Sequence, residues 1–452
     1  MRLRFMGCMV LGMMRVLVAE DFDPLDTKSL LPKQQATFVT CTTTDLTKSL
    51  GLSDVVMAAL CNNPQTKIAW QTSLYQAAQV GVSRSAYLPT LSATGSVLRS
   101  ESSETKSGNQ ENIGVTLSYL LYDFGKRDAT YDNARALLDV ALFSENGTIQ
   151  NVFLSAIQAY YTLFGSNASL EASREAERSA LESLNAAKTR YTVGTATPAD
   201  TLQAQTAYSQ AMLNRIQAEG NVKSAQGELA SVLGMMPDTT IQLQNPLLIL
   251  PSDTFEKNIR ALMEEAQRLR PDLMAASAKI KAAEANVKAA KADHMPTFSL
   301  SATSGHTDTV FNTSQRSSSI GLYVSIPIFT GFNTKYKVQA AQQQLKINEA
   351  EYEKLSQDAS LEVYKTYQTL VSETQATRTS SDLVASAQAS YDLSLGRYKA
   401  GVGTILDLLT AQSALASAKQ QHIQSLYNWY ITKASLAKAM GSLDFSTIKG
   451  QP

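Results

Sequence analysis

The side chains able to support acid–base or metal chemistry are few and scattered along this sequence. Its 452 residues include three histidines and three cysteines, the histidines being His294, His306 and His422. No His, Cys and carboxylate spacing matches a metal site, and neither a glycine-rich phosphate loop nor a nucleophile elbow is present. The sequence therefore predicts no enzyme, no cofactor and no metal.

Carboxylates occur instead in a stretch that is present twice, at residues 190–205 and 397–412. Eight of its sixteen positions are identical, and the copies lie 207 residues apart. The shared residues are Arg, Tyr, Gly, Thr, Asp, Leu, Ala and Gln, in that order. A pattern repeated at this distance indicates an internal duplication.

Each copy predicts a tight turn between two helices. Gly194 and Gly401 stand where a helix end favours a left-handed residue. In both copies a threonine precedes an aspartate by three residues, the spacing of a capping box, which assigns Asp200 and Asp407 to the start of the second helix. Helix capping is thus the simplest role of either carboxylate.

The N-terminal nineteen residues have the pattern of a secretory signal peptide, with Arg2 and Arg4 ahead of an apolar run. Cys8 lies inside that run and is interpreted as part of the signal. In an exported chain the other two cysteines, Cys41 and Cys61, form a disulfide or remain two thiols, and we expect the disulfide.

Composition excludes some classes of partner. The forty basic and forty acidic residues cancel, so the charge does not favour a nucleic-acid surface. After the signal no run of eighteen apolar residues occurs, so any membrane crossing must be made by strands.

Long helices dominate the expected secondary structure. They are expected from Ser53, a plausible N-cap, to about Tyr87, from Lys126 to Tyr191, from Ala199 to Leu233, and from Thr254 to Asp293, with breaks at the prolines Pro64 and Pro271. The same order follows in the second half. A helix of about 65 residues is near 100 Å long, which is too long for a compact domain.

Between the helices the period changes to two. Strands are expected around residues 91–97, 113–121, 298–303 and 320–328, the first two joined by a polar loop from about 100 to 112. Each has apolar residues on one face and small or hydroxylated residues on the other. Strands of about ten residues span a bilayer when tilted in a barrel.

The predicted organisation follows from the duplication. It consists of a signal peptide (1–19), an N-terminal extension (20–50), a first repeat (51–240), a linker (241–257), a second repeat (258–443) and a C-terminal tail (444–452).

Four strands leave unpaired edges, which are prohibitively costly inside a bilayer. Several chains must therefore close the sheet: two would give eight strands, and three would give twelve, enough to enclose a pore.

Taken together, these motifs resemble the TolC-like family of outer-membrane efflux and secretion channels. The resemblance rests on the two Arg-Tyr-x-x-Gly turns, the Ala-x-x-Asn-Asn-Pro sequence at 59–64 and the Pro-Ile-Phe-Thr-Gly-Phe junction at 327–332. It covers about residues 50 to 442. It implies a mostly helical fold with membrane β structure: a homotrimer whose helical hairpins form an α-barrel joined to a 12-stranded transmembrane β-barrel.

The resemblance also implies a function and a location. Such a trimer is a passive exit duct in the bacterial outer membrane that extends into the periplasm, contacts outer-membrane lipid, and works with a periplasmic adaptor and an inner-membrane pump or ABC transporter. Drug or solute efflux and type I protein secretion both fit. A periplasmic coiled-coil adaptor or structural protein is the alternative, but it explains the helices and not the four strands.

The resemblance assigns roles at the turns, which in the family converge to close the periplasmic mouth. Asp200 matches the acidic position of the first turn, Tyr398 and Gly401 belong to the second, and Asp407 matches an aspartate facing the pore constriction. Three copies of Asp407 would form a negative ring that binds cations. This sequence departs from the family at Gly403, where a gate arginine can stand, and at Thr410, where a second aspartate can stand.

Overall fold

The structure is a computed structural model that describes residues 23–31, 49–100, 108–245, 258–309 and 314–445. The chain divides into two compact units. The first unit contains the β-strands and the helix segments adjoining them, within residues 70–143 and 275–353. The second contains the remaining helical residues, within 38–69, 144–274 and 354–452.

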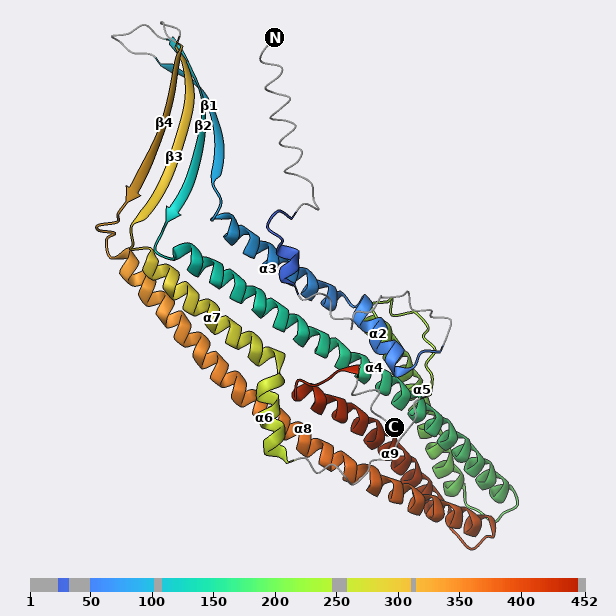
Figure 1. Ribbon diagram of the computed structural model, residues 1–452. Coiled ribbons are helices and arrows are strands. Elements are labelled where there is room, and N and C mark those ends of the chain that lie inside the picture. The colour runs from blue at the N-terminus through green and yellow to red at the C-terminus, as the bar shows by residue number, and fades with distance from the viewer. Residues whose placement is uncertain (1–22, 32–48, 101–107, 246–257, 310–313, 446–452) are drawn as a thin grey trace. The chain divides into compact units, whose positions relative to one another are not determined.

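Each α-helix of the first half has a counterpart of the same length in the second half, shown in Figure 1. The first four are α2 (Leu52–Asn62), α3 (Pro64–Ser85), α4 (Lys126–Thr192) and α5 (Pro198–Val232). Their counterparts are α6 (Ile259–Leu269), α7 (Pro271–Ala292), α8 (Asn333–Lys399) and α9 (Ile405–Ala439). The helix pattern therefore contains the duplication that the sequence predicts, including two helices of 67 residues.

The breaks between α2 and α3 and between α6 and α7 have one cause. Asn63 and Arg270 each precede a proline and have extended backbone, with ψ of 130° and 122°, because a residue before proline is disfavoured in the helical region. Both side chains then satisfy a carbonyl at the end of another helix. Asn63 Nδ2 donates to the Val232 carbonyl at 3.0 Å, and Arg270 Nη1 donates to the Ala439 carbonyl at 3.1 Å.

Four strands of the described chain form one antiparallel sheet in the order β1-β2-β3-β4 (Figure 1). Their bounds are β1 Thr90–Ser100, β2 Gly108–Tyr122, β3 Thr297–Thr309 and β4 Gln315–Ser325. The central pair, β2 and β3, joins the first half of the chain to the second. The irregularity in this pair lies between Leu120 and Tyr122.

The register places unlike residues on the two faces of the sheet. One row of directly paired residues is apolar and runs Leu91, Leu117, Ala302, Ile320 across the four strands. The next row is hydroxylated and runs Ser92, Thr116, Thr303, Ser319. The apolar row stays uncovered in the single chain, since Leu91 is 71% and Ile320 74% exposed. The alternation predicted from the sequence is confirmed.

β1 and β4 are the two edges of this sheet. Each pairs along one side only among the described residues, with β2 and β3 respectively. Backbone N–H and C=O groups on the outer sides therefore have no ladder partner in the described part of the chain. Such groups must find partners before the sheet can lie in lipid.

The main hydrophobic cluster lies in the second unit. Phe153 and Tyr160 of α4 pack with Val56 of α2, Leu229 of α5 and Tyr430 of α9, all at most 3% exposed. The Tyr160 hydroxyl donates to the Gln244 carbonyl at 2.9 Å. Many of the remaining members are alanines, which allow helices to approach closely.

Several expected element boundaries were wrong. β2 begins at Gly108, inside the expected loop, because residues 108–112 pair with β1 and their polar side chains do not prevent ladder bonds. β4 ends at Ser325, before Ile326 and Ile328, where Pro327 cannot donate to a ladder. The N-cap of α2 is Gly51, not Ser53; its N–H donates to Asp54 at 3.0 Å.

Other predictions fall partly outside the described residues. The signal peptide, Cys41, most of the linker and most of the C-terminal tail lie there, and Cys61 is described within α2. The Cys41–Cys61 disulfide therefore stays a prediction. In the extension, Thr27–Leu30 form a short 3-10 helix, and Leu31 packs with Ala77, Val80 and Leu138. Among the described helices, none combines the length and the apolar character needed to cross a membrane.

Arg270, at the break between α6 and α7, carries a buried charge. Its side chain is 8% exposed and contacts Glu362 at 2.6 Å and Asp272 at 2.7 Å. Arg270→Ala should lower the free energy of unfolding by about 2 kcal/mol, because it removes the donor to the Ala439 carbonyl and leaves Glu362 with Lys438 and Asp272 with the Leu273 N–H as their remaining donors. The expected loss of stability is modest because both carboxylates are more than one-third exposed, and solvent weakens exposed ion pairs. Thermal unfolding, with the exposed Arg268→Ala as control, measures the loss.

The same substitution should change the pH dependence of stability. Burial raises the pKa of Asp272 and Glu362, but the hydrogen bonds and charge of Arg270 outweigh it, so both pKa values are lowered. Carboxylates with lowered pKa stabilise the fold above their unfolded pKa, and that contribution is lost as pH falls through the folded pKa. Arg270→Ala should therefore flatten the acid limb of a stability profile. An unchanged acid limb would contradict this.

Candidate functional site

The first repeated stretch forms the turn between α4 and α5. Gly194 has φ of +77°, and its N–H donates to the Tyr191 carbonyl at 3.0 Å. The next N–H, of Thr195, reaches back to the Arg190 carbonyl at 2.8 Å. These two bonds close the end of α4, and the left-handed glycine lets the chain reverse.

The second stretch forms the same turn between α8 and α9. Gly401 has φ of +79°, its N–H donates to the Tyr398 carbonyl at 3.0 Å, and the Val402 N–H donates to the Arg397 carbonyl at 3.0 Å. The predicted helix end, left-handed glycine and helix start are confirmed in both copies.

Both aspartates cap the returning helices. Asp200 accepts the Thr197 N–H at 2.8 Å, and its own N–H donates to the Thr197 hydroxyl oxygen at 3.3 Å. Asp407 accepts the Thr404 N–H at 3.3 Å and donates its N–H to the Thr404 hydroxyl oxygen at 3.1 Å. Capping uses one oxygen of each carboxylate, so the other remains available. A role for Asp407 in a ring of several copies stays a prediction.

Tyr398 is buried between the two turns. Its ring is 3% exposed and lies under the guanidinium of Arg190, with Cζ 4.7 Å from the ring centroid. Arg190 Nη1 also donates to the Tyr398 carbonyl at 3.0 Å. One residue from each copy thus ties the end of α4 to the end of α8.

Arg190 was not among the expected site residues. The signal was present, because an arginine opens both copies of the repeat, but the sequence alone does not say which arginine reaches the other copy.

Asp200 and Arg190 both act electrostatically on the Tyr398 hydroxyl. Burial raises the pKa of Tyr398, Arg190 opposes this and Asp200 adds to it, so the hydroxyl is neutral at physiological pH. Among the described residues this hydroxyl has no hydrogen-bond partner.

Asp407 lies in a different environment. It is exposed, and hydrogen bonds with Thr404, helped by the charge of Arg397, lower its pKa. Its carboxylate therefore stays ionised below the usual range for aspartate. The structure brings Asp200, Tyr398 and Arg190 together, and places Asp407 on the exposed side of the second turn.

The position that can carry an arginine in the family is closed in this turn. A Cβ built on Gly403 would lie 3.0 Å from both Arg397 Cβ and the Tyr398 backbone nitrogen. A larger side chain at 403 would thus require the end of α8 to shift. The absence of an arginine here agrees with the local packing.

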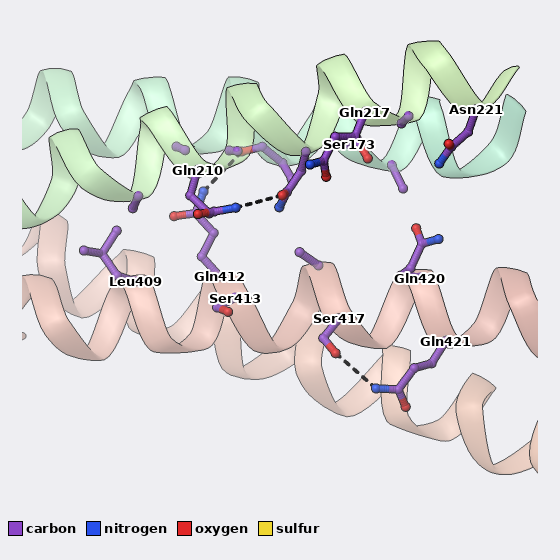
Figure 2. Close-up of a pocket in the computed structure, with 18 residues that line it drawn as sticks. Ser173, Gln210, Gln217, Asn221, Leu409, Gln412, Ser413, Ser417, Gln420 and Gln421 are labelled. Carbon is purple, nitrogen blue, oxygen red and sulfur yellow. Dashed lines mark hydrogen bonds between the residues drawn. The ribbon is translucent and has the colours of Figure 1, made fainter. Parts of the chain in front are cut away.

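A groove of about 530 Å³ lies behind the turns, between α4, α5 and α9. Figure 2 shows Gln412 and Gln420 of α9 pointing towards α5, whose Gln210 and Gln217 line the opposite wall. All of its lining residues are uncharged, mostly alanine, serine and glutamine. The groove offers hydrogen bonds to a polar surface but no group for acid–base chemistry.

The histidines lie apart from the turns. His306 is on β3, His422 is on α9 beside Ser380, and His294 follows α7. Within the described part of the chain, no group of three or more His, Cys, Asp and Glu side chains is placed to hold a metal ion. The turns provide a buried neutral tyrosine, a cation stacked on it, a half-buried carboxylate at Asp200 and an exposed one at Asp407, an arrangement suited to binding ions or to holding helices together.

The sequence profile of outer membrane efflux proteins matches residues 55–235 and 262–442, two segments displaced by the repeat distance. Protein CyaE of Bordetella pertussis is 32% identical over 90% of this chain and 87% of its own length. Outer membrane efflux protein BepC of Brucella suis is 26% identical, covering 88% of each protein. In three dimensions the outer-membrane channel OprN superposes with a TM-score of 0.78 at 19% identity, over 86% of this chain and 90% of that one.

Gly401→Ala tests the turn directly. The φ of +79° is unfavourable for a residue with a Cβ, although the space around it is open, so the change should cost about 1 kcal/mol of folding free energy. Gly396→Ala, in the last part of α8, is the matched control and should stabilise by about 0.5 kcal/mol, since that glycine is helical. Thermal unfolding of the two variants gives the comparison. Equal shifts in the same direction would contradict a left-handed turn.

Proposed function

Because the chain belongs to the TolC-like family of outer membrane efflux proteins, we propose that three copies form a passive exit duct through the outer membrane. The family consists of outer-membrane channels that extend into the periplasm. In this proposal an inner-membrane pump supplies the energy and a periplasmic adaptor joins the pump to the duct.

The observation that carries the proposal is the open, two-faced sheet. Its apolar face suits lipid, and its hydroxylated face suits water in a pore. Its edges β1 and β4 have no partner within the described chain. Three copies would join β4 of one to β1 of the next and close a barrel of twelve strands, wide enough to enclose a channel.

The helices support a second tube, made of the hairpins of the three copies. Each copy supplies two helical hairpins, α4–α5 and α8–α9, whose turns meet through Arg190 and Tyr398. Three copies would contribute six such turns around one axis. We propose that these turns are the periplasmic gate, with Asp200, Tyr398, Gly401 and Asp407 in it.

Nothing in the described site selects the transported load. One relative is named an efflux protein, which favours efflux as the role of this duct. A duct of the same construction would also suit polypeptides of a type I secretion system. Deleting the gene separates the two loads: hypersensitivity to drugs and detergents indicates efflux, and loss of a protein from the culture medium indicates secretion. The alternative to a duct is a periplasmic coiled-coil adaptor or structural protein.

Reconstitution of the purified protein tests the duct itself. The protein, extracted from outer membranes, should produce stable single-channel conductance in planar bilayers, because the assembled barrel encloses a water-filled pore. Recovery only as soluble periplasmic protein, without conductance, would reject the duct in favour of an adaptor.

Asp407→Asn tests the gate. The amide keeps an oxygen that can accept the Thr404 N–H, so the cap is retained while the charge is removed. If three Asp407 side chains line the constriction, the variant should lose most of the block by trivalent cations, by at least about tenfold in blocking constant. Single-channel recording with a trivalent cation on the periplasmic side measures it. Asp382→Asn, on the exposed surface of α8, is the control, and the trivalent cation should block it as strongly as it blocks the unchanged protein.

The block should also depend on pH in a defined direction. Hydrogen bonding with Thr404 lowers the pKa of Asp407 in the single chain, whereas the like charges of a three-carboxylate ring oppose ionisation, so the block should disappear as these carboxylates become protonated at acidic pH. A block that is unchanged at acidic pH, or that survives in Asp407→Asn, would argue against this carboxylate.

A further inference from the structure

The charged and titratable residues of the four strands all belong to one face of the sheet. They are Arg99 on β1, Glu111 on β2, His306 and Asp308 on β3, and Arg316 on β4. The pairing register places them on the face of the apolar row that contains Leu91 and Ile320, and not on the hydroxylated face. A water-filled pore favours charges on the hydroxylated face, so these residues need another explanation.

These residues gather at one end of the strands. Helices of the same unit adjoin the opposite end, where α3 leads into β1 and β2 leads into α4 (Figure 1). Because channels of this family extend into the periplasm, the charged end of the sheet is the one at the outer leaflet. Residues 316–324 of β4 cover about 26 Å of strand, or about 20 Å of height in a tilted barrel, against an apolar band about 25 Å tall. Arg316 therefore lies near the outer edge of that band.

One row of directly paired residues crosses the sheet at this level. It runs Gly95, Ile113, His306, Arg316 from β1 to β4. The β1–β2 half of the row is apolar, and Ile113 is 65% exposed. The β3–β4 half has an imidazole and a guanidinium, whose Cβ atoms stand about 5 Å apart in such a pair. The row thus presents an apolar surface beside a cationic one.

Arg316 has no anionic partner within the described chain. It is exposed, and it makes no hydrogen bond or ion pair with another described residue. By contrast, Ser304 and Ser318, in the adjacent row nearer the helices, hydrogen-bond each other at 3.0 Å. An arginine at the edge of a lipid layer is stabilised by an anion, and its planar guanidinium matches phosphate with two parallel hydrogen bonds. Arg316 is therefore free to bind a phosphate.

Two carboxylates limit where that phosphate can lie. Glu111 and Asp308 are directly paired in the next row outward, both are exposed, and neither forms an ion pair with another described residue. Their like charges repel a phosphate from that row. Towards the helices, β4 instead presents Ile320 and Leu322, which are 74% and 62% exposed. A phosphate on Arg316 thus lies between a repelling row and an apolar surface suited to acyl chains.

We propose that Arg316 binds the phosphate of an anionic lipid in the outer leaflet of the outer membrane. The guanidinium holds two phosphate oxygens, His306 stands beside them on the neighbouring strand, and acyl chains cover Ile320 and Leu322. The occupant is a lipid because the cationic and apolar groups share one face, whereas a free anion would use the guanidinium alone. The inference rests on the proposed membrane sheet, in which the apolar face meets lipid.

Lipid binding to the purified full-length protein tests the site. The probe is diphosphoryl lipid A, added to delipidated protein in detergent, and the bound lipid is counted by native mass spectrometry. Arg316→Gln should bind it about tenfold or more weakly than the unchanged protein, because the amide cannot form the two charge-assisted bonds. Equal binding by the two proteins would overturn the site.

Asp308→Asn is the matched control on the same face. It should bind lipid A at least as well as the unchanged protein, because it removes a charge that repels phosphate. A loss equal to that of Arg316→Gln would mean that the carboxylate holds a bridging cation, and it would overturn direct binding by the arginine.

Changing the lipid gives a measurement that does not depend on the folding of a variant. Lipid A without its phosphates should bind the unchanged protein as weakly as lipid A binds Arg316→Gln. Equal binding of the two lipids to the unchanged protein would reject a phosphate site. Inorganic phosphate at the concentration of the lipid should not displace it, and displacement would assign Arg316 to a free anion instead of a lipid.

Conductance of the same preparations separates this inference from the proposed function. A conducting protein that binds both forms of lipid A equally leaves the duct standing and rejects the lipid site. A non-conducting protein that prefers the phosphorylated lipid, and loses this preference in Arg316→Gln, rejects the duct and supports the lipid site.

Discussion

The requirement that every backbone polar group in a bilayer be hydrogen-bonded governs this structure. The four-stranded sheet satisfies that requirement between β1 and β2, β2 and β3, and β3 and β4, and leaves it unmet at the outer sides of β1 and β4. Its apolar face is uncovered as well, with Leu91 and Ile320 largely exposed. The described sheet therefore has the pattern of a membrane wall with two open edges, and this is why we propose that further copies of the chain close it.

Gene duplication explains how one helical pattern serves both halves, and divergence explains why the halves are not equivalent. The two turns share their left-handed glycine and capping box, although the bond from the threonine N–H to the aspartate is 2.8 Å in the first turn and 3.3 Å in the second. Their surroundings differ, since Tyr398 is buried under Arg190 while Tyr191 is open to solvent. The asymmetry arises because a single chain can join its first hairpin to its second only once.

Much of this fold is predictable from the sequence. The helices are predictable because their proline-free length, the Gly194 and Gly401 turns and the Thr/Asp caps are local signals that the structure obeys. The strand faces follow from simple alternation. The start of β2 is not predictable in this way, because it depends on pairing with a neighbouring strand. The end of β4 was predictable from Pro327, since proline cannot donate to a ladder. Arg190 escaped prediction for a related reason: choosing between two equivalent arginines requires knowing which hairpins meet in space.

The central claim is that the open sheet and the twin hairpins are one-third of a closed duct. The most direct test is the mass of the complex extracted from the outer membrane, measured by native mass spectrometry after removal of detergent. We expect a mass equal to three copies of the chain, with no smaller species at the protein concentration of the measurement. A stable monomer, or a dimer whose eight strands would fill their own interior, would contradict it.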